Sequence, residues 1–346
     1  MRDIWGYQKF ETYGAILTDN NDPWNSNYDY TYVAFVRDGI QELVKLRATN
    51  NQRPSIDYFY QFTPGTVTPS HERHLQKNVP QRIVDDTADN RYMYLAGRYG
   101  GAASVFKLNK SSFEIMWYAQ FDQMSNIHAF ETATHCDSDC RFWQGSSLAE
   151  PEEQLYMCGD HLTYASADPQ GGEYTGAIAS LTPSGKGRWY IKVSGGNVGG
   201  RNQDKCLGIT MAHGTYNVGV LIQGKMAELR VTNDNTYDTI LILLSADGQA
   251  SKAISFTQGD KALDMYSAPG GLIAHDSGRN TDSFFFAGYS GGFATKYRYW
   301  LSGGQTWNYD NYDSYVYKFD FGQPYYTQEC LYQTQVYTSG TINRVI

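Results

Sequence analysis

The sequence predicts an all-β chain in which one structural unit recurs. Three observations support this prediction: the composition, a repeated hairpin pattern, and a second pattern of strands that end on glycine. Aromatic residues make up 15% of the 346 residues and charged residues 18%, with 29 tyrosines and 34 glycines. Aromatic residues favour strands and glycine favours tight turns, so this composition favours strands over helices.

The hairpin pattern consists of an apolar strand, a short turn and a second strand. In its two clearest copies, Leu181 and Leu244 are each followed four residues later by a glycine, Gly185 and Gly248. Copies start near residues 32, 104, 176, 239 and 315. These starts are spaced widely enough for a four-stranded sheet with its loops.

The second pattern is an apolar pair that ends in Asp or His, followed by a turn and a strand that ends on glycine. Asp86 and His213 precede Gly97 and Gly224 by the same distance, and Asp276 begins a copy with a longer turn. A sandwich has no reason for such a period, and a β-helix usually has shorter coils.

The two patterns together predict a β-propeller of four-stranded antiparallel blades that occupies residues 1–346 as a single domain. Five blades are favoured, with six or seven as alternatives because residues 47–82 fit the period least well. The fifth start leaves too few residues for a whole blade. Residues 1–19 are therefore expected to complete the last blade, so that strands from both termini close the ring.

The repeat also carries a family resemblance. An apolar-Lys-Leu strand (105–108), a Ser-Gly turn, a tryptophan, and a tyrosine-rich strand ending in Ala-Gly (92–97) resemble the seven-bladed β-propeller repeats of bacterial surface proteins. The resemblance covers residues 83–290 and extends more loosely to quinoprotein-like propellers. It implies a fold and no catalytic residues, and this chain has longer and fewer repeats.

Charge and composition limit the partners. The net charge is −8, and Lys and Arg are scattered without the basic stripe that follows a phosphate backbone, which argues against nucleic acid. No segment approaches the ~20 apolar residues of a membrane-spanning helix. The start of the chain lacks the apolar core of a signal peptide, so secretion would need a signal that was removed or lies outside these residues. We expect no cofactor.

Two groups of residues could carry chemistry. Ser290, in Gly-Tyr-Ser-Gly-Gly, matches the nucleophile pattern of hydrolases, but the aromatic residues after it give no helix signal, so a turn is favoured. Asp86, His213 and Asp276 occupy equivalent positions and could ring a channel as metal ligands or acid–base groups. The favoured interpretation is structural, with each side chain accepting hydrogen bonds from turn amides.

Two covalent modifications are predicted. Cys136 and Cys140 favour a short-loop disulfide over free thiols, and a zinc site with His135 lacks a second pair of ligands. Asn109, in Asn-Lys-Ser, is the one N-glycosylation sequon and falls on a predicted hairpin turn, where a glycan would be accessible.

The candidate binding residues are Trp24, Tyr28, Trp307 and Tyr312, from two similar aromatic and acidic loops. Such side chains can stack on sugar rings or anchor a protein partner, or they can fill the gaps between blades.

The sequence thus predicts a non-catalytic structural module that is a subunit or domain of an extracellular or cell-surface assembly and binds protein or glycan through its loops. The alternative is a propeller enzyme, either a quinoprotein-like oxidoreductase or a glycan-active hydrolase.

Overall fold

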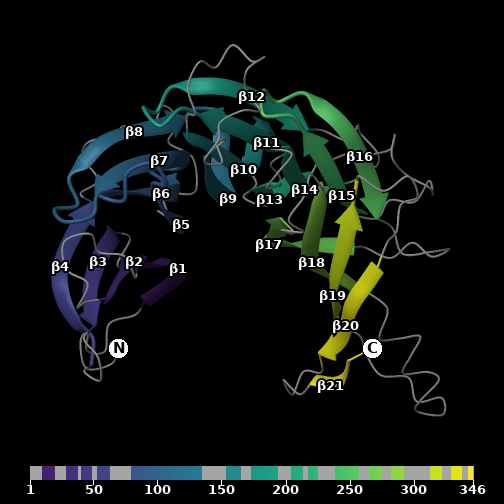
Figure 1. Cartoon of the computed structure of the whole chain (residues 1–346), viewed down its shortest axis with the longest axis horizontal. Helices are drawn as coiled ribbons and strands as arrows, with labels where there is room; N and C mark the ends of the chain where they lie inside the picture. The colour runs from purple at the N-terminus through teal and green to yellow at the C-terminus, as the bar shows by residue number, and fades with distance from the viewer. Residues whose placement is uncertain are drawn as a thin grey trace. The chain divides into compact units, whose positions relative to one another are not determined.

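The computed structural model shows an all-β chain (Figure 1). It describes residues 10–19, 29–37, 40–48, 53–62, 79–134, 153–164, 173–193, 204–212, 217–224, 238–256, 265–274, 282–291, 312–321, 329–336 and 342–345. These residues form strands and turns, and within them there is no helix, so none that could cross a bilayer. The predicted fold class is confirmed at this level.

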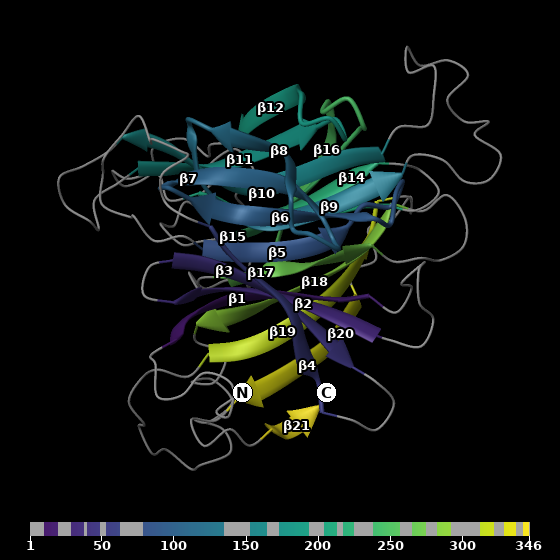
Figure 2. The same ribbon diagram turned by 90° about the vertical axis from the view of Figure 1, so that its left-hand side faces the viewer.

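The described strands form five sheets, in which the strands follow one another in chain order (Figures 1 and 2). The first sheet contains β1 (Phe10–Asp19), β2 (Asp29–Arg37), β3 (Ile40–Ala48) and β4 (Ser55–Phe62). The second contains β5 (Val79–Asp85), β6 (Tyr92–Tyr99), β7 (Ala102–Asn109) and β8 (Ile115–Phe121). The third contains β9 (Met124–Thr134), β10 (Glu153–Tyr164), β11 (Glu173–Leu181) and β12 (Gly187–Val193).

The last two sheets lie in the C-terminal part of the chain. The fourth contains β13 (Lys205–Met211), β14 (Val218–Gly224), β15 (Asp238–Leu244) and β16 (Ala250–Phe256). The fifth contains β17 (Met265–Ala274), β18 (Ser283–Gly291), β19 (Tyr312–Asp320), β20 (Glu329–Val336) and β21 (Ile342–Val345). Strand pairing is antiparallel in the first, second, fourth and fifth sheets.

The chain divides into two compact units, which we describe separately. Unit 1 comprises Met1–Tyr156 and Ser180–Arg188, and unit 2 comprises Met157–Ala179 and Trp189–Ile346. Unit 1 therefore holds the first and second sheets, and unit 2 holds the fourth and fifth. The strands of the third sheet are shared between the units.

The predicted blade starts do not coincide with the starts of the sheets. Residues 104, 176, 239 and 315 fall at third strands, and residue 32 falls in β2, a second strand. The tandem pattern predicts the period but not the phase. Only Asp122 and Gln123 connect β8, the last strand of the second sheet, to β9, the first strand of the third. This connection is as short as a hairpin turn, so the sequence does not reveal where one sheet ends and the next begins.

The prediction that residues 1–19 complete the last blade is wrong for Phe10–Asp19. These residues form β1, which pairs with β2 in the first sheet, from Ala15 opposite Ala34 to Asp19 opposite Tyr30. The fifth sheet has five strands, all from the C-terminal part of the chain. Because β20 and β21 supply its outer strands, the fifth sheet needs no strand from the N-terminus.

The apolar core lies between successive sheets. In unit 1, one cluster joins the first two sheets through residues that include Tyr32, Leu43 and Leu95. In unit 2, another joins the fourth and fifth sheets through residues that include Leu241 and Phe284. Successive sheets also meet along their first strands, with β1 against β5 and β5 against β9 in unit 1, and β13 against β17 in unit 2.

One position on the fourth strands recurs and contacts the turn between the third and fourth strands of the next sheet. In β8, Trp117 Nε1 donates a hydrogen bond to the carbonyl oxygen of Pro183 at 2.9 Å. In β12, Trp189 Nε1 donates to the carbonyl oxygen of Ala246 at 3.1 Å. Each pair lies within one unit.

The glycines of the repeated turns explain why these tryptophans fit. Gly185 and Gly248 have φ angles of +81° and +85°, a left-handed conformation that favours glycine. A Cβ at Gly185 would lie 2.8 Å from the Trp117 ring, and one at Gly248 would lie 2.8 Å from the Trp189 ring. Glycine is therefore required at this position for two reasons. The turn needs a left-handed backbone conformation, and the tryptophan ring that packs against the turn leaves no room for a Cβ.

Two other sheets use the same position with different side chains. Lys252 Nζ in β16 donates a hydrogen bond to the carbonyl oxygen of Phe321 at 2.9 Å. In β4, the Tyr58 ring lies 5.1 Å from the Phe113 ring, in the turn between β7 and β8. Four sheets thus contact the next sheet at the same place, through aromatic or cationic side chains that reach a backbone carbonyl or an aromatic ring.

Candidate functional site

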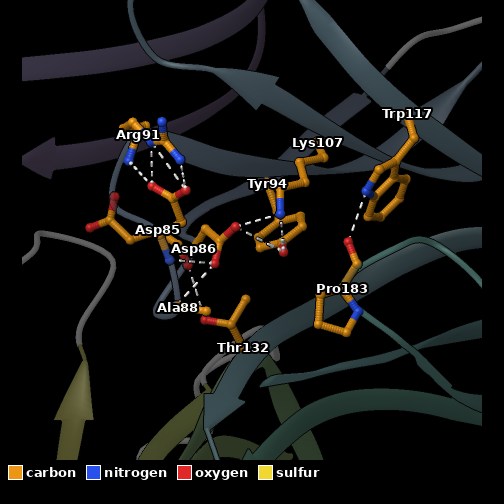
Figure 3. A network of polar contacts seen from close by, with 10 residues as sticks. Asp85, Asp86, Ala88, Arg91, Tyr94, Lys107, Trp117, Thr132 and Pro183 are labelled. Carbon is orange, nitrogen blue, oxygen red and sulfur yellow. Dashed lines mark hydrogen bonds and ion pairs between the residues drawn. The ribbon is translucent and has the colours of Figure 1, made fainter. Parts of the chain in front are cut away.

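A buried polar cluster lies at the end of the second sheet where β5 leads into β6 (Figure 3). Asp86 is 2% exposed, and its Oδ2 lies 2.6 Å from Lys107 Nζ and accepts a hydrogen bond from the Tyr94 hydroxyl at 3.3 Å. Its Oδ1 accepts hydrogen bonds from the backbone N–H groups of Ala88 and Asp89 at 3.0 and 3.1 Å. Figure 3 shows Lys107 and Tyr94 pointing toward this carboxylate.

The tyrosine–lysine part of this cluster is a repeated feature. Tyr94 pairs with Lys107 across β6 and β7, and Lys107 Nζ lies 5.2 Å from the centre of the Tyr94 ring. In the first sheet, Tyr32 pairs with Lys45 across β2 and β3, and Lys45 Nζ lies 5.8 Å from the Tyr32 ring and 3.8 Å from the Tyr30 ring. Lysine over an aromatic face is stabilising, more so when the cation is desolvated.

The geometry of Asp86 favours structure over catalysis. Both carboxylate oxygens have partners within the chain, and two of those partners are amides of the following turn. The predicted hydrogen bonds from turn amides to the Asp86 carboxylate are therefore confirmed. The equivalent residues, His213 and Asp276, lie outside the described residues, so the predicted ring of three polar side chains stays a prediction.

Two further ion pairs lie near Asp86, at the ends of the same strands. Arg91 and Asp89 form an exposed ion pair, with Arg91 Nη2 2.5 Å from Asp89 Oδ2, and this hydrogen bond lowers the pKa of Asp89 to about 2. Lys110 Nζ lies 2.6 Å from Asp85 Oδ1, and Thr132 Oγ1 of β9 donates to the carbonyl oxygen of Asp85 at 3.1 Å. Exposed pairs such as the first add little stability.

A second buried polar pair lies in unit 2. The Tyr190 hydroxyl in β12 lies 2.9 Å from His161 Nδ1 in β10, and His161 is 4% exposed. Burial raises the pKa of Tyr190 to about 12, so the phenol is protonated at neutral pH. The contact is thus a hydrogen bond of an uncharged phenol. No sequence pattern predicted this pair, although Tyr190 follows Trp189 in the repeated hairpin as Tyr118 follows Trp117.

A small hollow lies beside β6 and is lined by residues that include Gln41, Pro80 and Phe106. Within the described ranges, no three His, Cys, Asp or Glu side chains are placed to hold a metal ion.

Ser290 lies in a strand. It belongs to β18 and pairs with Met265 on one side and Asp313 on the other. The strained strand-to-helix turn of a hydrolase nucleophile is therefore not present at this residue. The preference for a turn was wrong in detail, since Ser290 is still within the ladder, but the argument against a nucleophile elbow is supported.

The predicted binding residues fall almost entirely outside the described residues. This applies to Trp24, Tyr28 and Trp307, whereas Tyr312 is the first residue of β19 and pairs with Gly291. The sequence suggested that the two aromatic loops occupy equivalent places in the repeat, but in the structure they do not. One connects a first strand to a second, β1 to β2, and the other connects a second strand to a third, β18 to β19.

The predicted modification sites have different outcomes. Cys136 and Cys140 lie outside the described residues. Asn109 ends β7 and begins the turn into β8, as predicted. Its side-chain oxygen accepts hydrogen bonds from the N–H of Ser111 at 2.8 Å and from the N–H of Ser112 at 3.3 Å. This side chain therefore already has a local role, which is to order the turn.

Exposed apolar side chains gather on the fourth strands of unit 1. They are Ile56, Tyr58 and Phe59 in β4, and Met116 and Tyr118 in β8, each between 37% and 50% exposed. We call these five residues the outer-strand surface. Both strands lie at the edge of their sheets. Neither contains Lys, Arg or Pro, the residues with which proteins usually protect an edge strand.

Sequence reasoning missed the outer-strand surface because it searched the loops. The charge of the fourth strands was a signal that could have revealed this surface. The outer strands β12 and β16 carry cationic residues, namely Arg188, Lys192 and Lys252. In contrast, the only charged residue of β4 is Asp57, and β8 has none.

Comparison with models of protein families and with curated proteins found no match for this chain in either.

Proposed function

We propose that the chain is a non-catalytic interaction module that serves as a subunit of an extracellular or cell-surface assembly, with a second copy of this chain as the partner of β4. The observation that supports this proposal is the outer-strand surface. It combines exposed aromatic residues with strand edges that carry no lysine, arginine or proline. Exposed apolar residues on a strand edge without protecting charges favour pairing with another chain.

The residues of β4 are compatible with pairing to a second β4. In an antiparallel pair centred on Phe59, a two-fold axis places Asp57 opposite Gln61 and Tyr58 opposite Tyr60. No like charges then face each other, and aromatic residues meet across the strands. Both arrangements stabilise a cross-strand pair.

The proposal predicts a concentration-dependent dimer that a charge on β4 disrupts. Phe59→Lys places two lysines opposite each other at the two-fold axis, so we expect the dissociation constant to rise about tenfold or more. Sedimentation velocity over a concentration series measures this. The matched control is Ile273→Lys, which adds the same charge at an exposed apolar residue of β17.

Two results would contradict the role of β4. The wild-type chain could remain monomeric at every concentration, or Phe59→Lys and Ile273→Lys could weaken the dimer equally. Thermal melting of both variants separates loss of association from loss of folding, since Phe59 is 37% exposed and its replacement should leave the fold intact.

We also propose that the five sheets form one closed β-propeller, like the bacterial surface repeats that the sequence resembles. Five successive sheets and the recurring contact from the fourth strands of four of them to the next sheet support this. A compact chain of this length has a radius of gyration of about 20 Å. Small-angle X-ray scattering should give a value near that figure, and a clearly larger value would contradict a closed ring.

The loop aromatics Trp24, Tyr28, Trp307 and Tyr312 stay predicted contacts for a further protein or a glycan. Their replacement by alanine tests them separately from β4, because none of them lies in that strand.

A further inference from the structure

The strand β8 lies at an edge of the second sheet and lacks the residues that protect such an edge. Among the described strands of its sheet, it pairs with β7 alone. Its outer edge therefore presents backbone N–H and C=O groups, which form a template on which a further strand can add. The strand contains no charged residue and no proline to prevent this.

Tyr118 of β8 occupies the same place in its sheet as Phe59 of β4. In each strand this residue follows the one that contacts the turn of the next sheet, which is Trp117 in β8 and Tyr58 in β4. Tyr118 is 50% exposed and Phe59 is 37% exposed. The edge feature on which the β4 contact was proposed is therefore repeated in β8.

The fourth strands of the third and fourth sheets differ at this place. In β12 the residue is Tyr190, whose hydroxyl is bonded to His161, and in β16 it is Ala253. Both strands also carry a lysine, Lys192 and Lys252. Among β4, β8, β12 and β16, only β4 and β8 combine an exposed aromatic residue with an edge that has no cation.

The Tyr118 ring is held in position by the core. It stacks on Phe106 with ring centres 5.9 Å apart, and Phe106 belongs to the apolar cluster that joins the first two sheets. An aromatic side chain that is already ordered loses little conformational entropy when a partner covers it.

The absence of charge makes β8 suitable for contact between copies of this chain. The net charge is −8, so two copies repel each other over most of their surface. Repulsion is smallest where both meeting strands are uncharged, as two copies of β8 are.

We propose that β8 pairs antiparallel with β8 of a second copy, across a two-fold axis at Tyr118. The inference rests on the proposed role of the chain as an interaction module and repeats the register of the β4 contact. The axis places Tyr118 opposite its own copy and Met116 opposite Gln120. Each copy then binds one partner through β4 and another through β8, so association continues beyond the dimer.

Two carboxylates make the β8 contact the weaker of the two. Glu114 precedes the strand and Asp122 follows it, and both are exposed. In the proposed register Glu114 of one copy approaches Asp122 of the other, and like charges opposite each other are destabilising. Dimers should therefore form through β4 first and join through β8 at higher protein concentration.

The experiment is sedimentation velocity of the full chain over a concentration series. Tyr118→Lys places two lysines at the proposed axis, as Phe59→Lys does in β4. Glu114→Gln removes the repulsion and keeps the size of the side chain. The matched control is Ile273→Lys on β17, and thermal melting of each variant checks that it is folded.

We expect concentrated wild-type chain to form species larger than a dimer. Tyr118→Lys should stop at the dimer, with the dissociation constant of the larger species raised about tenfold or more. Glu114→Gln should lower that constant several-fold. Phe59→Lys should keep only the weaker β8 dimer, and Phe59→Lys combined with Tyr118→Lys should be monomeric.

A second variant covers the case in which Tyr118→Lys disturbs the fold through the lost stacking. Met116→Lys adds a cation to the same edge at a residue that is 47% exposed, and it should also stop association at the dimer.

The β8 contact would be overturned by wild-type association that ends at a dimer which Tyr118→Lys leaves intact. Larger species that persist in folded Tyr118→Lys and Met116→Lys would overturn it too. If Phe59→Lys changes nothing and Tyr118→Lys abolishes association, the β8 contact holds and the β4 pairing fails. A wild-type chain that stays monomeric contradicts both.

Discussion

Replacing Gly97 with alanine should lower the free energy of unfolding by about 3 kcal/mol or more. Gly97 lies in β6 opposite Pro80, beside a bulge in β5. A Cβ there would be 2.1 Å from the carbonyl oxygen of Val79 and 2.9 Å from the backbone nitrogen of Gln81. These are backbone atoms, so no side-chain rotation can relieve the overlap, and β5 would have to separate from β6.

Gly187→Ala is the matched control. Gly187 begins β12, is exposed, and a Cβ there would have no neighbour within 4 Å. Its replacement should change stability by less than about 1 kcal/mol, because it mainly restricts the unfolded chain. Urea unfolding of both variants measures the difference. Equal midpoints for the two would show that the close approach of β5 and β6 is not present.

Lys107→Met should lower the free energy of unfolding by about 3 kcal/mol. It removes the cation that lies 2.6 Å from the buried carboxylate of Asp86, so this carboxylate loses that counter-charge. The methionine keeps most of the apolar length of lysine, so the loss reports on charge. The control is Arg91→Met, which breaks the exposed pair with Asp89 and should cost less than about 1 kcal/mol.

A double variant tests whether the charge is the cause. With Lys107→Met, Asp86→Asn removes the charge and retains a side-chain oxygen for the turn amides. It should be more stable than Lys107→Met alone, because a buried charge without a partner is worse than none. If Lys107→Met costs no more than Arg91→Met, the structural role of the Asp86 cluster is wrong.

The repeated turn explains how much of the fold could be predicted. Gly185 and Gly248 recur at the same distance after a leucine because the same left-handed turn recurs. Gly97, near the end of β6, is required for a second reason, which is the close approach of β5. These are local requirements of the backbone, and local requirements are visible in a sequence.

The phase of the repeat could not be predicted, because it depends on which strands pair. β1 could complete the first sheet or the last without any change in its own residues. The contact position on the fourth strand was also hidden, since Tyr58, Trp117 and Lys252 have no chemistry in common that a pattern search would detect. Their equivalence appears only when the strands are aligned by pairing.

The candidate site was missed for a related reason. Sequence reasoning looked for aromatic residues in loops, where recognition is usual. In the sequence, exposed aromatic residues on an edge strand cannot be distinguished from the buried aromatic residues of an inner strand. Only the order of the strands in the sheet shows that β4 is an edge. Asp86 was interpreted correctly because an aspartate before a turn has a local hydrogen-bonding role that does not depend on the rest of the fold.

The most direct test of the interaction module is hydrogen–deuterium exchange of β4 as a function of protein concentration. The proposed pairing predicts that backbone amides of Ser55–Phe62 exchange more slowly in concentrated than in dilute protein, while those of the charged outer strand β12 (Gly187–Val193) exchange at the same rate in both. Exchange of Ser55–Phe62 that does not change with concentration would contradict pairing through β4.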